Sequence, residues 1–189
     1  MKKIALTVLL VATAANADIY KESFGLTHWG SIAGNVIDHD FNLGAIDSID
    51  SVVITLSHDD ASDIELFLTA PDGRVFTLSD DNGFNVNLGT GDSFLHDTRK
   101  YTFVESSNHG NWGDVIPFGF AFSGEYQADE WQSGSFGAGT WNITLNDDSV
   151  FDNGAVGYVA VNYTSSVPAP GAAALLGLGG LVATRRRRA

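Results

Sequence analysis

The chain has 189 residues, of which 44% are hydrophobic and 11% aromatic, and it contains 21 glycines and no cysteine. This composition supports one ordinary domain with a hydrophobic core and excludes wholesale disorder. The lack of cysteine excludes thiol catalysis, zinc–thiolate sites and disulfides. The many glycines favour an all-β chain rich in turns.

Charge is distributed unevenly along the chain. Six of the ten basic residues lie at its two ends, and all 23 acidic residues lie between Asp18 and Asp152. The four remaining basic residues leave that region with a formal charge of −19. A field of this sign repels nucleic acid and anionic membranes and attracts cations. We therefore expect no nucleic-acid partner, and the carboxylates serve either solubility or cation binding.

Residues 1–17 have the pattern of a secretory signal peptide. Lys2 and Lys3 precede an apolar stretch, and Ala15-Asn16-Ala17 supplies small residues at the cleavage positions. The apolar stretch predicts a short helix that is too short to span a membrane. We therefore predict export, with signal peptidase as a processing partner and residues 18–166 as the folded domain outside the cytoplasm.

Alternating apolar residues predict the strands of this domain. Such residues recur at every second position, which places them on one face of a strand. They are Val52, Ile54 and Leu56, then Ile64, Leu66 and Leu68, then Phe76 and Leu78. Residues 101–105 alternate too, and two further strands carry Trp141, Ile143 and Leu145, and Val159, Val161 and Tyr163. Pro71-Asp72-Gly73 has the chemistry of a hairpin turn. The prediction is an antiparallel β-sandwich in which Leu66, Trp141 and Val161 share one core.

Two blocks of the sequence resemble the P domain, also called the P/Homo B domain. The first is SHDDASDIELFLTAPDGRVFTL, from Ser57 to Leu78. The second combines Gly124-Glu125-Tyr126 with GTWNITLND, from Gly139 to Asp147, and Asp152-Asn153-Gly154. The resemblance implies a galactose-binding-like jelly roll, a module that accompanies kexin- and furin-like subtilases and occurs in bacterial secreted proteins.

Acidic turn loops, together with this resemblance, favour a calcium site. Calcium takes six to eight oxygen ligands from carboxylates, carbonyls and amides. The candidate ligands are Asp59, Asp60 and Asp63 in one loop, Asp80 and Asp81 in a second, and Asp147, Asp148 and Asp152 in a third. Asp63, Asp147 and Asp152 are the preferred set. The alternative is that these side chains cap turn amides.

Aromatic residues between positions 112 and 131 have two interpretations. Phe118, Phe120 and Phe122 alternate as the core face of a strand does. Trp112 and Trp131 stand among polar loop residues and are the candidates for stacking on sugar rings.

The sequence contains no catalytic signature. Gly-x-Ser-x-Gly, His-Glu-x-x-His and phosphate-binding glycine loops are all missing from the chain. Because acidic residues are numerous, a glycoside hydrolase with two catalytic carboxylates remains an alternative, but no sequence motif identifies such a pair. We therefore expect a protein that is not an enzyme.

Residues 167–189 resemble the PEP-CTERM sorting signal, which exosortase-type membrane proteases process. A Pro-containing tetrapeptide, Val167-Pro168-Ala169-Pro170, precedes an apolar segment and the cluster Arg185, Arg186, Arg187 and Arg188. The segment 172–184 would form a helix of about 20 Å, against roughly 30 Å of hydrocarbon. The arginines would hold their end in the cytoplasm. The tail therefore predicts an inner-membrane anchor during sorting, followed by a cell-surface or extracellular location.

Three functions remain open at this stage. The first is a non-catalytic module of the cell surface that associates with extracellular polysaccharide or matrix and is stabilised by calcium. The second is an accessory P domain that acts with a separate secreted subtilisin-like protease. The third is a small hydrolase with an unmarked carboxylate pair.

Overall fold

The computed structural model describes residues 16–30, 35–83, 86–89, 98–115, 119–149 and 153–165, with the backbone alone at 16, 25–30, 35 and 153. Apart from Asn16, these residues belong to one compact unit, Ala17–Ser165. The predicted terminal helices, the tail 167–189 and nearly all of the signal peptide lie outside the described residues. Asp152 of the predicted calcium set lies outside them too.

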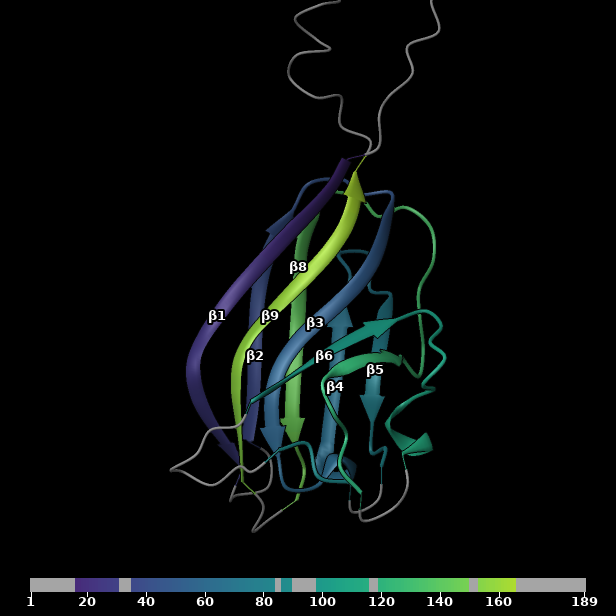
Figure 1. Cartoon of the computed structure of the whole chain (residues 1–189). Coiled ribbons are helices and arrows are strands. Elements are labelled where there is room, and N and C mark those ends of the chain that lie inside the picture. The colour runs from purple at the N-terminus through teal and green to yellow at the C-terminus, as the bar shows by residue number, and fades with distance from the viewer. Residues whose placement is uncertain are drawn as a thin grey trace, which may run out of the picture. The chain divides into compact units, whose positions relative to one another are not determined.

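Nine strands and two 3₁₀ helices make up the regular structure of the described residues (Figure 1). The strands are β1 (Asn16–Gly30), β2 (Asn35–Leu43), β3 (Ser48–His58), β4 (Ile64–Thr69), β5 (Val75–Asp80), β6 (Arg99–Val104), β7 (Gly124–Gln127), β8 (Gly139–Asp147) and β9 (Asn153–Ser165). The helices are η1 (Ala61–Asp63) and η2 (Trp112–Asp114). The segments predicted from alternation lie on β3, β4, β5, β6, β8 and β9.

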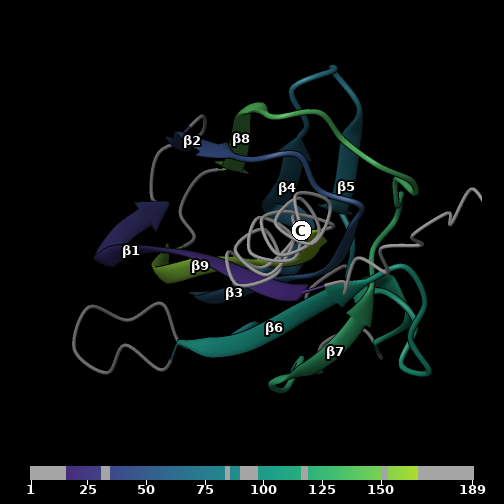
Figure 2. The same cartoon turned by 90° about the horizontal axis from the view of Figure 1, so that it is seen from above.

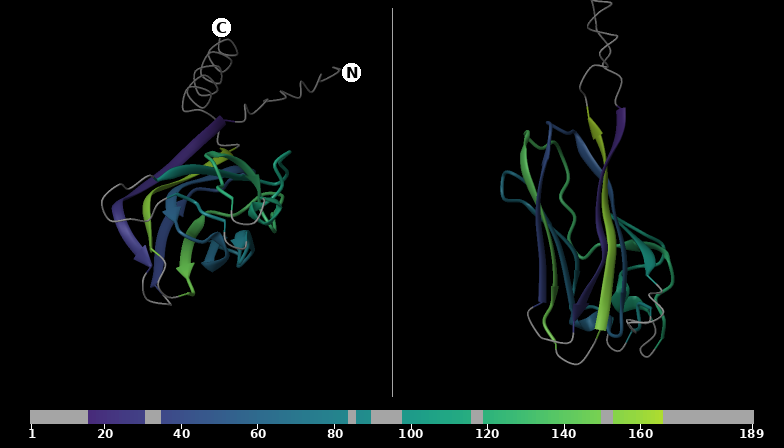
Figure 3. Two further views of the ribbon diagram at one scale, coloured as in Figure 1. Left: turned by 60° about the horizontal axis from the view of Figure 1, so that its bottom comes forward. Right: turned by 90° about the vertical axis from the view of Figure 1, so that its left-hand side faces the viewer.

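The strands form two sheets that pack face to face. One has the order β1-β9-β3-β6-β7 and the other β2-β8-β4-β5. Figure 2 and the right-hand view of Figure 3 show the two layers. β3 pairs antiparallel with β9 and β6, β8 pairs antiparallel with β2 and β4, and β7 joins β6 in parallel. Without β7, each sheet keeps four strands in jelly-roll order. The predicted all-β antiparallel sandwich is confirmed.

The core lies between the sheets and follows the predicted alternation. On β4, Ile64, Leu66 and Leu68 are buried, and the residues between them are partly exposed. Leu66, Trp141 and Val161, from three different strands, are each 0% exposed and belong to one hydrophobic cluster. Because each fully buried side chain of this kind contributes roughly 1.5–3 kcal/mol, this cluster is the main favourable term in folding.

The hairpin turn between β4 and β5 forms as predicted. Gly73 has a φ of +86°, which a residue with a side chain rarely adopts, and its N–H donates to the Ala70 carbonyl oxygen at 2.9 Å. The Arg74 N–H donates to Asp72 Oδ1 at 3.1 Å, and its guanidinium pairs with Asp72 Oδ2 at 2.8 Å.

The aromatic segment before β7 differs from the prediction of a core face. Phe120 is 52% exposed and Phe122 is 68% exposed, whereas Ala121 between them is buried. Phe118 lies outside the described residues. The physical reason is a backbone bridge, in which the Ala121 N–H donates to the Asn87 carbonyl oxygen at 3.0 Å. This bridge turns the small residue inward and both phenylalanines outward.

A polar pair without exposed surface joins β3 to β8. His58 Nε2 lies 3.4 Å from Asp147 Oδ2, and His58 Nδ1 lies 2.6 Å from the Asp60 carbonyl oxygen. Asp147 Oδ1 accepts the Ser149 N–H at 3.1 Å. His58 and Asp147 are both 0% exposed, so removing one of them leaves the other buried without its polar partner.

This pair predicts a specific pattern of stability changes. His58→Leu should lower the free energy of unfolding by about 3–5 kcal/mol, because Asp147 stays buried without its partner. The double variant His58→Leu/Asp147→Leu should recover most of that loss. Urea unfolding measures both values, and an equal loss in the two variants would contradict the pairing.

Candidate metal centre

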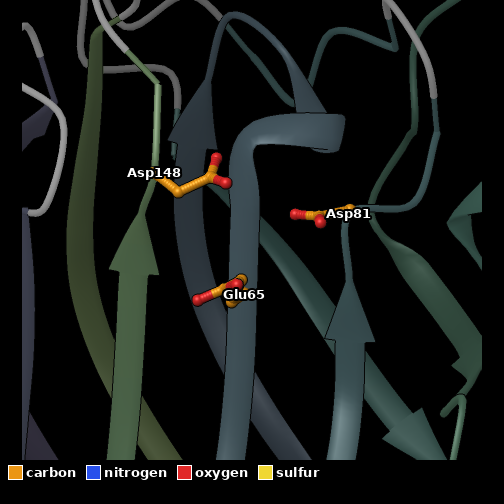
Figure 4. Close-up of side chains that lie close together, drawn as sticks. All are labelled: Glu65, Asp81 and Asp148. Atoms are coloured by element: carbon orange, nitrogen blue, oxygen red, sulfur yellow. The ribbon is translucent and has the colours of Figure 1, made fainter.

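Three acidic side chains from neighbouring strands gather at one end of the four-stranded sheet. Glu65 lies on β4, Asp81 directly follows β5 and Asp148 directly follows β8. One carboxylate oxygen from each lies within 4.8 Å of the other two. Figure 4 shows Asp81 and Asp148 pointing toward each other from either side of β4, with Glu65 below them. We call these three residues the acidic triad.

The sheet register explains why the triad forms. Glu65 is paired with Asn146 of β8 on one side and with Asp80 of β5 on the other. Asp80 immediately precedes Asp81, and Asn146 lies two residues before Asp148. Because Ile64 and Leu66 face the core, alternation turns Glu65 to the outer surface of the sheet.

Two contacts position the ends of the flanking strands. The Asp148 N–H donates to the Asp63 carbonyl oxygen at 3.1 Å, which holds the end of β8 against η1. Asp81 lies in the left-handed region with a φ of +51°. The residues on either side of it bond to one carboxylate oxygen, Asp129 Oδ2, through the Asp80 N–H at 2.9 Å and the Asn82 amide. Asp129 therefore acts as a positioning residue for Asp81.

Asp129 is itself held by a third polar contact. Its Oδ1 accepts Asn111 Nδ2 at 2.9 Å, which ties the loop before η2 to the end of β5. Burial raises the pKa of Asp129, and the hydrogen bond from Asn111 acts in the opposite direction. Nothing in the sequence marked Asp129, because its partners come from segments that lie far apart along the chain.

Partial desolvation and neighbouring negative charges both act on the triad. The pKa of Asp81 is raised, first by partial desolvation and then by the charges of Asp148, Asp80, Glu65 and Asp63. The pKa of Asp148 is raised by desolvation and by Glu65, Asp63 and Asp147. Among the residues that the structure describes, no lysine, arginine or histidine forms an ion pair with the triad.

The donor set suits a hard cation. Calcium–oxygen distances are about 2.3–2.6 Å, so two ligands of one ion lie at most roughly 5.2 Å apart, a condition that the triad meets because its oxygens lie within 4.8 Å of one another. Asn146 Nδ2 donates to Glu65 Oε2 at 2.6 Å, and Asn146 Oδ1 is buried without a hydrogen-bond partner among the described residues. The triad contains no nitrogen or sulfur ligand of the kind that structural zinc sites use.

Of the acidic residues named from the sequence, the structure brings Asp81 and Asp148 into the triad. Asp63 and Asp80 lie near enough for their charges to act on Asp81. Asp60 caps η1 instead, because its side chain accepts the Ser62 N–H at 3.0 Å. This is the alternative role, capping of turn amides, that the sequence analysis gave for these carboxylates. Asp59 lies between β3 and η1 and is not a member of the triad.

Asp152 of the preferred set lies outside the described residues, and Asp63 and Asp147 are not members of the triad. Asp147 continues the inward-facing alternation of β8 and is buried against His58, so it cannot reach a solvent-exposed ion. The next residue, Asp148, faces outward and takes the place that we had assigned to Asp147. Glu65 was missed because its role depends on register with two other strands.

The two tryptophans proposed to bind sugar occupy different environments. Trp112 is 1% exposed and packs edge-on against Tyr101 at 5.2 Å and Phe103 at 5.1 Å. The expectation of a sugar-stacking Trp112 is therefore wrong, since the core covers both ring faces. Trp131 is partly buried and packs edge-on against Phe76 at 5.0 Å between ring centroids.

Comparisons with known proteins are sparse. No family model and no curated protein matches the chain. A crystal structure of a serine protease of Aeromonas sobria aligns with 11% identity and a TM-score of 0.42, over 84% of this chain and 28% of that one. The structure of infectious bursal disease virus Gx strain aligns with 14% identity and a TM-score of 0.39, over 91% and 38%. The chain thus spans well under half of either relative.

The raised pKa values predict how the triad affects stability without metal. A folded-state pKa above the unfolded value means that ionisation costs stability as the pH rises through that value. Asp148→Asn should therefore raise the melting temperature at pH 7 in chelator, since it removes a repelled charge. Thermal unfolding at pH 7 measures this.

Asp72→Asn is the matched control. The hydrogen bond from Arg74 lowers the pKa of Asp72, so ionisation of this group favours the folded state. The melting temperature should fall in this variant. A fall in both variants would contradict the account of repulsion within the triad.

Proposed function

We propose that this chain is a non-catalytic jelly-roll module that is exported, sorted to the cell envelope and stabilised by calcium. It would act at the cell surface in association with extracellular polysaccharide or matrix. The acidic triad supports the calcium part of this proposal. One oxygen from each of its three carboxylates lies within 4.8 Å of the other two, and no basic residue among the described residues forms an ion pair with them.

The buried His58–Asp147 pair supports a role other than catalysis. An acid–base pair must reach its substrate, directly or through one water. Because His58 and Asp147 have no exposed surface, no substrate can approach them in this fold. The carboxylates of the triad are exposed or half-exposed and repel one another, which favours cation binding.

Calcium should stabilise the folded protein by mass action. At a calcium concentration of about 100 times the dissociation constant, binding adds roughly 2.7 kcal/mol to the free energy of unfolding. For a chain of this size that corresponds to a rise in melting temperature of about 5–11 °C. Thermal unfolding with calcium and then with chelator measures the difference.

Two variants assign that shift to the triad. Asp148→Asn should abolish most of the calcium-dependent rise, while Asp47→Asn, which changes an exposed acidic residue outside the triad, should keep it. Equal melting temperatures of the unmodified protein in calcium and in chelator would contradict the proposal that calcium stabilises the fold.

Export and sorting rest on the sequence of the two ends. In the part of the chain that the structure describes, no helix is long and apolar enough to cross a membrane. The signal-peptide pattern and the tail 167–189 remain the support for an exported protein that exosortase-type processing releases or anchors.

The tail predicts a localisation experiment. Replacing Arg185–Arg188 with glutamine should weaken retention of the tail in the inner membrane, because positively charged residues keep their end of a membrane segment on the cytoplasmic side. Cell fractionation should then show less protein in the inner membrane than for the unmodified chain. An unchanged distribution would contradict the sorting proposal.

A second candidate function is that of an accessory domain for a separate subtilisin-like protease. The two longest stretches that resemble the P domain fall mainly on β4, β5 and β8, which lie side by side in one sheet, whereas Gly124-Glu125-Tyr126 lies on β7 of the other sheet. Co-purification of a secreted subtilase with the tagged chain would favour this function over association with polysaccharide.

A further inference from the structure

A pocket of about 310 Å³ opens beside β7 of the five-stranded sheet, whereas the acidic triad lies on the four-stranded sheet. Its volume is at the lower end of the range for small-molecule sites, about 300–1,000 Å³, which suits a single ring with its substituents. Three of its lining residues are exposed, so the pocket leaves room for the rest of a polymer to continue into solvent. The described residues that line it are His109, Val115, Phe122, Ser123, Gly124 and Tyr126.

An exposed aromatic ring forms one wall of the pocket. Phe122 is 68% exposed, although most large apolar side chains of the described residues are buried. The Tyr126 hydroxyl donates to the Phe122 carbonyl oxygen at 2.9 Å, which holds the backbone that carries this ring. Val115 adds a second apolar side chain to the lining. Such a wall can stack against a flat apolar surface, and the C–H groups on one face of a sugar ring provide that surface.

Two polar groups of the lining can pair with ligand hydroxyls. His109 Nδ1 lies 3.0 Å from the Glu125 carbonyl oxygen, which can only accept, so Nδ1 carries the hydrogen and Nε2 of the neutral ring is an acceptor. Among the described residues, Nε2 has no hydrogen-bond partner. The Ser123 hydroxyl oxygen accepts the Lys100 N–H at 3.1 Å, which leaves its hydrogen to donate. The pocket therefore offers one acceptor and one donor.

The electrostatics of the pocket favour a neutral ligand. Its described lining contains no aspartate, glutamate, lysine or arginine. Arg99 does not line the pocket, and its guanidinium donates to the Ala121 carbonyl oxygen at 2.8 Å. The region between Asp18 and Asp152 carries a formal charge of −19, and a field of this sign repels anions. An anionic sugar would meet this repulsion without gaining an ion pair.

The two hydrogen-bonding groups favour a sugar over an aromatic side chain of a peptide. A tyrosine ring also stacks on Phe122, but its single hydroxyl pairs with only one of His109 and Ser123. A pyranose carries several hydroxyls around its rim, and each of them can donate and accept. Two of these hydroxyls can therefore use both groups while the apolar face of the sugar lies on Phe122.

We infer that this pocket binds one neutral pyranose residue of a polysaccharide. The apolar face of the sugar lies on Phe122, one hydroxyl donates to His109 Nε2, and another accepts from the Ser123 hydroxyl. The inference rests on the proposed function at the cell surface and names the class of polysaccharide that the module recognises. Phe122 takes the stacking role that the sequence analysis gave to Trp112.

The chain offers two disruptive variants and a matched control. A Cβ added at Gly124 would meet Tyr126 Cε2 at 3.7 Å and the Phe122 carbonyl oxygen at 3.8 Å, which are ordinary contacts, so Gly124→Val should fill the pocket without straining the backbone. Phe122→Ala removes the stacking ring. Phe120→Ala is the control, because Phe120 is 52% exposed and also lies near Arg99 but does not line the pocket.

The experiment titrates the full chain, purified in mild detergent, with galactotriose, cellotriose and trigalacturonate by calorimetry. Chelator is present throughout, so that calcium cannot bridge a uronate to the acidic triad. At least one neutral trisaccharide should bind, and trigalacturonate should bind at least about tenfold more weakly, a difference of about 1.4 kcal/mol. Added salt should leave binding of the neutral sugar nearly unchanged, because no ion pair is screened. N-acetyltyrosinamide, as a peptide probe, should bind more weakly than the neutral sugar.

Phe122→Ala and Gly124→Val should each weaken binding of the neutral sugar about tenfold or more, and Phe120→Ala should leave it unchanged. Unaltered melting temperatures show that the variants fold, and if Gly124→Val does not fold, the two phenylalanine variants decide the test. Equal losses in Phe122→Ala and Phe120→Ala, or tighter binding of N-acetyltyrosinamide than of either neutral sugar, would overturn the inference.

Failure of this site can be told apart from failure of the proposed function. Tighter binding of trigalacturonate, or neutral-sugar binding that Phe122→Ala leaves intact, overturns the inference while association with polysaccharide stands. If none of the three saccharides binds, the inference falls, and a calcium-dependent melting shift that persists still supports the calcium part of the proposed function.

Discussion

The alternation of side chains along β8 is the constraint on which most of this structure depends. β8 lies between β2 and β4, so its inner face must fill the centre of the sandwich. Trp141, Ile143 and Leu145 do so, and the same alternation carries Asp147 inward to meet His58. The following residue, Asp148, is exposed and joins the triad. Core packing, the buried pair and the candidate metal centre thus share one strand register.

The carboxylates of this acidic domain have different physical roles, although the sequence presents them as one class. Asp60 caps a helix, Asp129 orients a turn, and Asp147 is paired in the core. The triad brings three carboxylates within 4.8 Å of one another, and no lysine, arginine or histidine of the described residues forms an ion pair with them. A concentration of like charge costs stability in the free protein, and a bound cation removes that cost. This difference, rather than the overall charge, supports a calcium site.

Aromatic residues show the same dependence on tertiary context. Trp112 stands among polar residues in the sequence, yet η2 carries it into the core between Tyr101 and Phe103. Phe122 alternates as a core residue does, yet the bridge between Asn87 and the segment 119–121 turns it outward beside Arg99. A residue that local alternation assigns to the interior therefore lies on the surface.

The sequence by itself determined strands β3 to β6, β8 and β9, the hairpin at Gly73 and the core residues that these strands carry, because period-two alternation and turn chemistry are local properties. The same local reasoning predicted that acidic residues gather in turn loops. Only the tertiary structure decided which of them meet, since Glu65, Asp81 and Asp148 are joined by the register of three strands. A shift of one residue reverses the face of every side chain. For that reason Asp148 and not Asp147 reaches the surface.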